Sequence, residues 1–324
     1  MKTRAAVAVE AGKPLEIMEV DLDDPRFGEV LVEIKACGVN FPDTLIVQGL
    51  YQFKPELPFT PGSDIAGVVK AVGEKIKHLK VGDEVFGFVA HGGFAEEVVL
   101  DGKAVFPKPP NMDFPIAASF LMAYGTSYHA LKDRARLKEG ETLLVLGASG
   151  GVGLAAVELG KLMGAKVIAA ASTDEKLELC KEYGADETIN YSTEDLKAQI
   201  KVLTEGKGVD VVYDPVGGKY SEPALRGMAW EGRFLVVGFA AGDIPKIPLN
   251  LPLLKGCQVV GVFWGSFAMK FPNKNIQNTM ELMQWYAQGK LKPHIHAVYP
   301  LKDATKALEE MMNRKVRGKI VISN

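Results

Sequence analysis

Residues 143–154 read Leu-Leu-Val-Leu-Gly-Ala-Ser-Gly-Gly-Val-Gly-Leu, and this stretch decides the fold. The apolar run 143–146 is typical of a buried strand, and residues 154–163 carry apolar side chains at helical spacing. Between them lies a variant of the G-x-G-x-x-G pattern with alanine in the first place. A strand, a glycine turn and a helix open a dinucleotide-binding βαβ unit, and a second apolar strand follows at 166–171.

The chemistry explains why the residues of this turn are small. A pyrophosphate must come close to the backbone, and the free N–H groups at the start of the helix then donate to the anion. We therefore expect a cofactor-binding turn, with a plain glycine turn as the alternative. Its residues are Ala148, Ser149, Gly150, Gly151, Val152 and Gly153.

Length and composition narrow the class of protein. A chain of 324 residues with 47% hydrophobic and 24% charged residues is long enough for two domains with proper cores. A net charge of −2 argues against a nucleic-acid binder or a membrane-surface protein, and no uncharged run is a convincing membrane span. The three cysteines form no C-x-x-C and no disulfide framework, and the N-terminus holds no signal-peptide core. We therefore expect a cytoplasmic protein.

The pattern of strands and helices changes along the chain. Residues 1–121 alternate short strands with Pro and Gly turns, which predicts a compact β domain, and a helix is expected over 115–132. From 142 onward strands and helices alternate, which predicts an α/β domain with a doubly wound parallel sheet over 122–265. Residues 266–324 carry two helices and a last strand, 319–322, that would return to the first domain.

The end of the second strand indicates which nicotinamide cofactor binds. NAD-binding sheets place an acid there for the ribose 2′-hydroxyl, whereas here the strand ends at Ser172, with Lys176 one turn later. A hydroxyl and an ammonium suit a 2′-phosphate, so NADPH is the expected cofactor. The alternative is that Asp174 caps a helix and that Lys176 is solvated. Tyr191, after the third strand, could stack beside the adenosine phosphate.

Seven stretches together are similar to one family. They are Gly38-Val-Asn-x-x-Asp43, Gln48-Gly-Leu-Tyr51, Leu57-Pro-Phe-Thr-Pro-Gly62, Val81-Gly-Asp83, Gly147–Gly153, Asp214-Pro-Val-Gly-Gly218 and Val237-Gly-Phe239. The chain resembles the zinc-independent quinone oxidoreductase (zeta-crystallin-like) branch of the medium-chain dehydrogenase/reductase superfamily. This resemblance covers essentially the whole chain. It implies a GroES-like β domain plus a Rossmann domain, with NADPH bound in the cleft between them.

The resemblance also implies roles for single residues. Asn40 and Asp43 would sit beside the nicotinamide ribose, although Asp43 could instead be a helix cap. Tyr51 stands where enoyl-thioester reductases carry a tyrosine near the substrate, and its phenol could donate a proton; a loop aromatic that plugs the cleft is the alternative. Arg317 could approach the cofactor from the returning segment. The nicotinamide is expected to be lined by Thr126, Gly238 and Phe239, and by the backbone near Phe263, Trp264 and Gly265.

The zinc alcohol dehydrogenases of the superfamily differ from this chain at their metal ligands. Asn40 replaces their cysteine, and their Gly-His-Glu is here Gly62-Ser-Asp64. Cys37 lies three residues too early, and the pair His294 and His296 falls in an expected strand. A catalytic zinc needs three N, S or O donors from the protein, so we expect no metal site.

These observations together predict an NADPH-dependent reductase of a conjugated acceptor, either a quinone or an α,β-unsaturated carbonyl or enoyl thioester. The motifs do not separate these substrates, and the rival of another class is an NADPH-binding protein without enzymatic activity. The run 258–264 is rich in β-formers at the expected end of the parallel sheet. An apolar edge of this kind invites pairing with a copy of itself, so we expect a homodimer.

Overall fold

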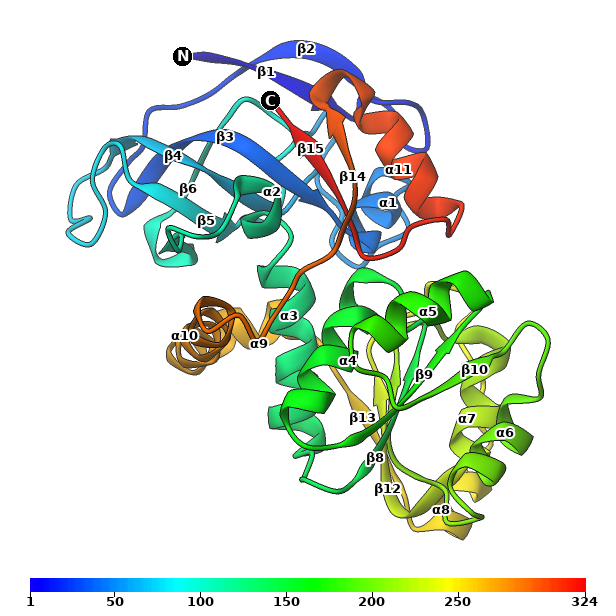
Figure 1. Cartoon of the computed structure of the whole chain (residues 1–324). Coiled ribbons are helices and arrows are strands. Elements are labelled where there is room, and N and C mark those ends of the chain that lie inside the picture. Colours follow the sequence, from blue (N-terminus) through cyan, green and yellow to red (C-terminus); the bar gives the residue numbers. More distant parts are fainter. The chain divides into compact units, whose positions relative to one another are not determined.

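Strand β8 (Thr142–Leu146) and helix α4 (Gly151–Leu162) lie where the glycine-rich stretch predicts them. The computed structural model describes residues 1–324, and these divide into two compact units. One unit comprises Met1–Met122 with Pro293–Asn324, and the other comprises Ala123–Lys292 (Figure 1).

The second unit is a six-stranded sheet in which every pairing is parallel. Its order is β10-β9-β8-β11-β12-β13, so its third, second and first strands precede its fourth, fifth and sixth, as in a Rossmann domain. The strands are β8, β9 (Lys166–Ala171), β10 (Glu187–Asn190), β11 (Val209–Asp214), β12 (Met228–Val236) and β13 (Gln258–Gly261). The helices are α4, α5 (Asp174–Glu182), α6 (Leu196–Leu203), α7 (Ser221–Arg226), α8 (Asn250–Lys255), α9 (Trp264–Lys270) and α10 (Pro272–Ala287).

The first unit is built around the long strand β3 (Glu29–Val39), which pairs with three neighbours. Its main sheet has the order β14-β15-β3-β4-β5-β7, with β6 also on β3. The other strands of the unit are β1 (Lys2–Val7), β2 (Glu16–Asp21), β4 (Asp64–Val72), β5 (Glu84–Phe88), β6 (Glu97–Asp101), β7 (Val105–Pro107), β14 (Ile295–Pro300) and β15 (Lys319–Ser323). The helices α1 (Phe41–Val47), α2 (Phe114–Ala117) and α11 (Ala304–Met312) complete it.

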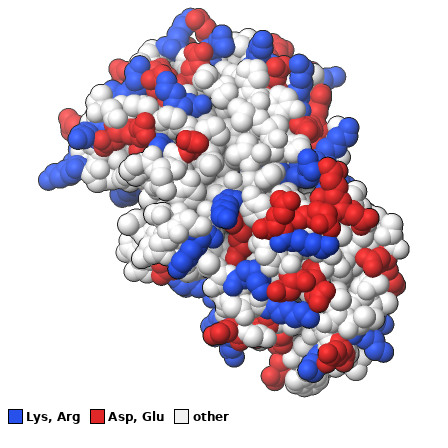
Figure 2. Space-filling view, in the orientation of Figure 1, with Lys and Arg blue, Asp and Glu red and all other residues white.

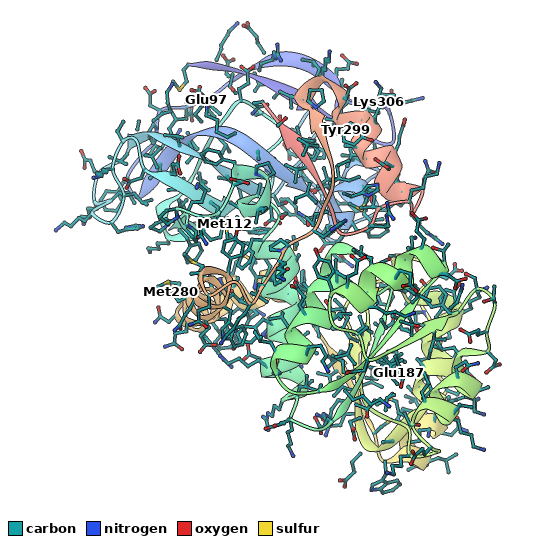
Figure 3. The ribbon with its side chains drawn as sticks, viewed as in Figure 1. Glu97, Met112, Glu187, Met280, Tyr299 and Lys306 are labelled. Atoms are coloured by element: carbon teal, nitrogen blue, oxygen red, sulfur yellow. The ribbon has the colours of Figure 1, made fainter.

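The returning segment confirms one sequence prediction. Strand β15 pairs antiparallel with β3, so the last strand of the chain belongs to the main sheet of the first unit (Figure 1). Tyr299 of β14 and Lys306 of α11, both labelled in Figure 3, belong to this segment. The hydroxyl of Tyr299 donates to Glu310 and ties β14 to α11.

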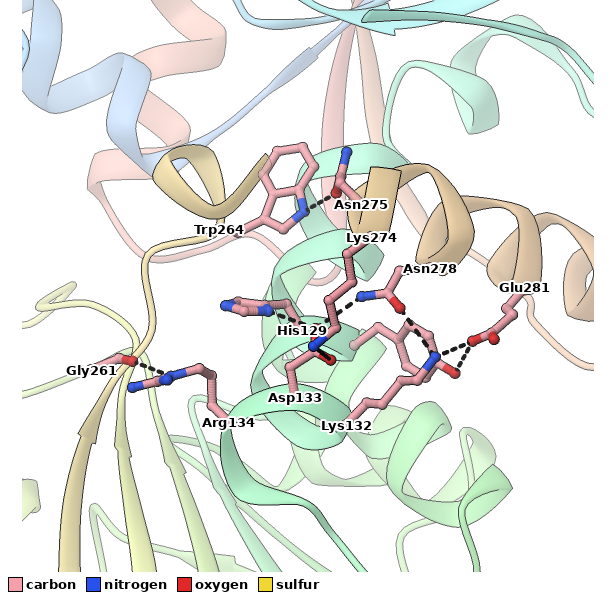
Figure 4. A network of polar contacts seen from close by, with 11 residues as sticks. His129, Lys132, Asp133, Arg134, Gly261, Trp264, Lys274, Asn275, Asn278 and Glu281 are labelled. Carbon is pink, nitrogen blue, oxygen red and sulfur yellow. Dashed lines mark hydrogen bonds and ion pairs between the residues drawn. The ribbon is translucent and has the colours of Figure 1, made fainter. Parts of the chain in front are cut away.

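The boundary of the second unit differs from the expected one, because residues 266–292 stay with it. Buried and half-buried polar groups fasten α10 to the π-helical turn His129–Ala135 (Figure 4). Asp133 accepts from His129 Nδ1 at 2.8 Å and from Asn278 Nδ2 at 3.0 Å, and it pairs with Lys274. The contact between Asp133 and Asn278 spans 145 positions of sequence, so the pattern of apolar residues did not indicate it.

One expected helix also differs in its bounds. The helix expected over 115–132 is divided into α2, α3 (Leu121–Tyr128) and the π-helical turn, which ends at Arg136 in a left-handed conformation.

Two further features are the charged groups on the surface and the apolar character of the helices. Figure 2 shows acidic and basic side chains interspersed on the face in view, with broad uncharged areas between them. None of the helices combines the length and the apolar character that crossing a bilayer requires.

Candidate active site

The turn between β8 and α4 is shaped by missing side chains. A Cβ atom on Gly153 would lie 2.3 Å from the carbonyl oxygen of Gly147, so only glycine fits where the helix meets the turn. Gly147 itself has a φ of +58°, which glycine adopts without strain. Gly150 is the N-cap of α4, and no side chain caps this helix start. The first N–H groups of α4 are therefore placed to bind an anion.

Helix α3 supports the same turn. Ser127 donates its hydroxyl to the carbonyl of Val152 at 2.7 Å and contacts the hydroxyl of buried Tyr213 at 2.9 Å. Ala148 and Ser149 are buried, whereas Gly150, Gly151 and Val152 keep partial exposure. The turn thus has a buried inner side and an accessible outer side.

The end of β9 brings together the residues expected to recognise a 2′-phosphate. Lys176 Nζ donates to Ser172 Oγ at 3.3 Å, so the ammonium lies directly beside the hydroxyl at the strand end. Thr173, and not Asp174, caps α5. Asp174 instead accepts a hydrogen bond from Asn190 Nδ2 at 2.8 Å.

Tyr191 lies at the end of the neighbouring strand. Its ring centroid is 4.3 Å from that of Tyr220, and the two planes are inclined by 41°. Both side chains are partly buried against the core of the sheet. The pair offers an aromatic surface next to the strand ends.

The remaining residues expected around the nicotinamide differ in how exposed they are. Thr126 lies in α3 and is 8% exposed, and Gly238 and Phe239 follow β12 with partial exposure. Phe263 is 56% exposed, but Trp264 is only 4% exposed. Its indole N–H donates to Asn275 at 3.0 Å (Figure 4). Its ring lies so close to Gly125 that a Cβ there would clash. Gly265 stands in the first turn of α9.

In the first unit Asn40 and Asp43 lie at the start of α1. Asn40 is the N-cap residue, and its backbone N–H donates to Asp43 Oδ2 at 2.7 Å. Asp43 is 1% exposed and also accepts from the backbone of Gly62. Burial raises the pKa of its carboxyl to about 7, against these hydrogen bonds and the charge of Lys319, which lower it. The helix cap and a carboxyl poised to hold a proton near neutrality are therefore the same residue.

Two further charged groups lie in this cluster, and the sequence did not mark either as functional. Asp64 is 1% exposed, and burial raises its pKa to about 6. Lys319, on β15, is 5% exposed, and its ammonium lies 3.9 Å from Asp64 Oδ2. A lysine directly before the apolar run Ile320–Ile322 of β15 was the available signal. Arg317, the basic residue expected from this segment, lies just before β15 with partial exposure.

Tyr51 follows α1 in a loop and is half-buried against the core of the first unit. Burial raises the pKa of its phenol, and the nearby carboxyl of Asp43 raises it further. The phenol therefore stays protonated at neutral pH and can donate. Two residues later Phe53 stacks on His91 with ring centroids 6.0 Å apart.

The positions of the superfamily's zinc ligands carry other groups here. Asn40 and Ser63 are both buried, and Ser63 Oγ donates to the carbonyl of Ala90 at 3.4 Å. No three His, Cys, Asp or Glu side chains are grouped so that they could hold a metal ion. His296 pairs with Glu310 at 3.1 Å, and Cys37 is buried beneath Gly62 and Gly93.

Comparison with known proteins places these features in a family. Residues 26–110 match the alcohol dehydrogenase GroES-like domain, and residues 151–285 match the family described as zinc-binding dehydrogenase. A protein of Nematostella vectensis called quinone oxidoreductase-like protein 2 homolog is 41% identical, over 99% of this chain and 88% of its own length. The chain belongs to the medium-chain dehydrogenase/reductase superfamily. The rat protein called quinone oxidoreductase-like protein 2 is also similar, with 40% identity over 99% of this chain and 92% of its own length.

Two solved structures of this superfamily bear on the site. A mycobacterial protein solved in complex with NADPH is 29% identical, with a TM-score of 0.93, over 99% of this chain and 100% of the other. The CurK enoyl reductase is also 29% identical, with a TM-score of 0.90, and 99% of each chain is covered. These likenesses support an oxidoreductase that uses a nicotinamide cofactor.

Proposed function

We propose that this protein is an NADPH-dependent oxidoreductase that passes hydride to a conjugated acceptor without zinc, with a quinone as the first candidate. The observation that carries the proposal is the start of α4, which no side chain caps and which lies behind a turn where a Cβ does not fit. This cradle suits a pyrophosphate.

The fit to NADPH rather than NADH rests on the pair Ser172 and Lys176. When bound, the cofactor supplies the hydride, and the protein positions and polarises the reactants. The ammonium and the hydroxyl would both bind a 2′-phosphate. Asp174 does not compete for that position, because one of its carboxylate oxygens is engaged by Asn190.

The electrostatics of the first unit support a conjugated acceptor. In place of metal ligands the cluster holds Asn40, Asp64 and the ammonium of Lys319, and a cation already present there disfavours a second one. Without a metal to polarise a simple carbonyl, a conjugated acceptor is the natural substrate, since it spreads the charge that the hydride brings. The protonated phenol of Tyr51 would then donate to the developing oxyanion.

A second substrate class is favoured by a specific likeness. The CurK enoyl reductase covers 99% of this chain, and an enoyl thioester accepts hydride into a conjugated system as a quinone does. Tyr51 suits both, because each product carries an oxygen that needs a proton. Quinone and enone or enoyl substrates should therefore be compared on the same protein.

The proposal extends to assembly and compartment. Strand β13 is the last strand of its sheet, with one edge unpaired within the chain, and we infer that it pairs with a second copy in a homodimer. Three unpaired cysteines, two of them buried, fit a reducing compartment such as the cytoplasm.

Cofactor preference tests the nucleotide assignment. Replacing Lys176 by Ala should weaken NADPH binding roughly ten- to hundredfold, because a charge-assisted contact to phosphate contributes about 1.5–3 kcal/mol. NADH binding should hardly change. Lys197→Ala, on the exposed side of α6, is the matched control and should leave both affinities as they are. Equal affinity of the unmutated protein for NADPH and NADH, by calorimetry, would rule out the assignment.

A further inference from the structure

The hydroxyls of Ser127 and Tyr213 form a buried chain behind the turn between β8 and α4. Both residues are fully buried, and their hydroxyl oxygens lie 2.9 Å apart. Ser127 Oγ also lies 2.7 Å from the carbonyl oxygen of Val152, the second residue of α4. The chain therefore joins three elements of the second unit, because β11 carries Tyr213, α3 carries Ser127 and α4 receives the last hydrogen bond.

The chemistry of these groups fixes which atom donates. A carbonyl oxygen only accepts, so the single hydrogen of the Ser127 hydroxyl points to Val152. The hydroxyl of Tyr213 must then donate to Ser127 Oγ, because its hydrogen would otherwise be buried without an acceptor. Burial also raises the pKa of Tyr213, which keeps that hydrogen in place. The chain thus runs in one direction, from Tyr213 through Ser127 to Val152.

The start of α4 needs support from outside the helix. Gly150 precedes the helix and has no side chain that could cap it, and Gly151 and Gly153 stand in the first turn. Glycine loses more conformational freedom in a helix than any other residue, so this turn is weak by itself. A hydrogen bond from α3 to a carbonyl of the first turn compensates for that weakness.

The position of this contact leaves the donors of the helix start available. The N–H of Leu154 donates to the carbonyl of Gly150 at 2.8 Å and makes the first backbone hydrogen bond of α4. The N–H groups of residues 151–153 come before it and can bind an anion. A capping side chain would occupy one of them, whereas Ser127 acts on a carbonyl. That carbonyl shares its peptide group with the N–H of Gly153, so the hydrogen bond also polarises this donor.

We propose that Ser127 is a positioning residue: its hydroxyl, oriented by Tyr213, holds the first turn of α4 by a carbonyl and leaves the N–H groups of that turn to the cofactor pyrophosphate. This inference rests on the proposed function, in which the turn binds that pyrophosphate. It adds a source of order for a helix start in which three of the four residues 150–153 are glycine. Because NADPH and NADH carry the same pyrophosphate, the contribution of Ser127 is equal for both.

Cofactor binding tests the positioning role. Ser127→Ala alone would leave the hydroxyl of Tyr213 buried without an acceptor, so the comparison is made in a Tyr213→Phe background. There, Ser127→Ala should weaken NADPH and NADH binding by the same factor, about five- to tenfold, the value of one hydrogen bond. Calorimetry measures both affinities. No loss for either cofactor, or a loss for NADPH alone, would overturn the proposal.

A second readout does not depend on the cofactor. The Leu154 amide makes the first backbone hydrogen bond of α4, so its hydrogen exchange reports opening of the first turn. In protein labelled with ¹⁵N-leucine, its signal is assigned by its loss in Leu154→Met. Ser127→Ala, in the Tyr213→Phe background, should speed this exchange at least about tenfold; an unchanged rate overturns the proposal. If the wild-type protein binds neither cofactor, the proposed function fails, and this exchange rate still decides whether Ser127 holds the turn.

Thr204 offers a matched control within the same unit. It is 8% exposed and follows α6, and its hydroxyl donates to the carbonyl of Ile200 at 2.7 Å and accepts from the N–H of Gly208 at 2.9 Å. Thr204→Val, in the same background, should lower thermal stability and leave the cofactor affinities and the exchange of the Leu154 amide unchanged. Effects as large as those of Ser127→Ala would mean that any lost buried hydroxyl loosens the unit, and positioning by Ser127 would be refuted.

Discussion

At the scale of single residues, the polar cluster of the first unit joins capping, charge balance and proposed chemistry. Asp43 caps α1 through Asn40, and the pKa of its buried carboxyl is about 7. It also acts on Tyr51, whose phenol pKa it helps to raise. The residue that orders the helix start therefore also keeps the proposed proton donor protonated.

Tyr51→Phe tests that donor. If the phenol supplies the proton, the variant should keep its NADPH affinity and lose about 10²- to 10⁴-fold in single-turnover rate on an enone. A quinone should suffer less, because its reduced oxygen can take a proton from water. A loss below about threefold on both substrates would make Tyr51 a packing residue. A strong loss of NADPH affinity would instead assign it to the cofactor site.

Local sequence patterns predicted contacts between residues near in sequence, but not contacts between distant ones. Ser172 and Lys176 lie together as expected. They are only four positions apart, where a strand ends and the next helix begins, so local structure alone brings them close. Lys319 and Asn40 are separated by 279 positions, and no local pattern states that they meet. The sequence likewise did not indicate that the indole of Trp264 is buried against Gly125 and bonded to Asn275, because these contacts depend on how α9 packs.

At the scale of elements, local patterns predicted the repeating strands and helices well. β8, α4 and β9 lie at the expected positions, because apolar periodicity and glycine turns act over a few residues. The helix expected over 115–132 is instead interrupted and ends in a π-helical turn, whose side chains pair with α10. Tertiary contacts of this kind override local helical preference.

Asp133 tests whether that pairing holds α10. Hydrogen bonds from His129, Lys274 and Asn278 outweigh the effect of burial and lower the pKa of Asp133 to about 2. Asp133→Asn should therefore reduce the free energy of unfolding by about 3 kcal/mol at neutral pH. The buried side chains of His129 and Asn278 would then lose the carboxylate that they contact. Glu222→Gln, in the more exposed pair with Arg226, should cost about 0.5 kcal/mol or less.

The pH dependence gives the sign of the Asp133 effect. A carboxyl with a lowered pKa in the folded state stabilises the fold above its unfolded pKa of about 4. The difference between wild type and Asp133→Asn should then shrink as the pH falls from about 4 toward 2. Denaturant unfolding at several pH values measures it, and a difference that stayed constant over that range would contradict the role given to this ion network.

At the scale of the whole molecule, assembly follows from an open edge. β13 pairs only with β12, and Val259 on it is 50% exposed. If two copies join their sheets at this edge, light scattering should give a mass of about twice the 35.1 kDa of one chain at micromolar concentration. Val259→Asp should shift the protein toward monomer. A monomeric wild type would contradict the proposed dimer.

The central claim is that this chain transfers hydride from NADPH to a conjugated acceptor without zinc. The most direct measurement is NADPH oxidation by protein shown by elemental analysis to be free of zinc, against matched panels of quinones and enones. The account predicts turnover with at least one panel, little turnover with NADH, and no gain when zinc is added. Tight NADPH binding with no turnover on either panel, or turnover that appears only after one zinc per chain is bound, would contradict it.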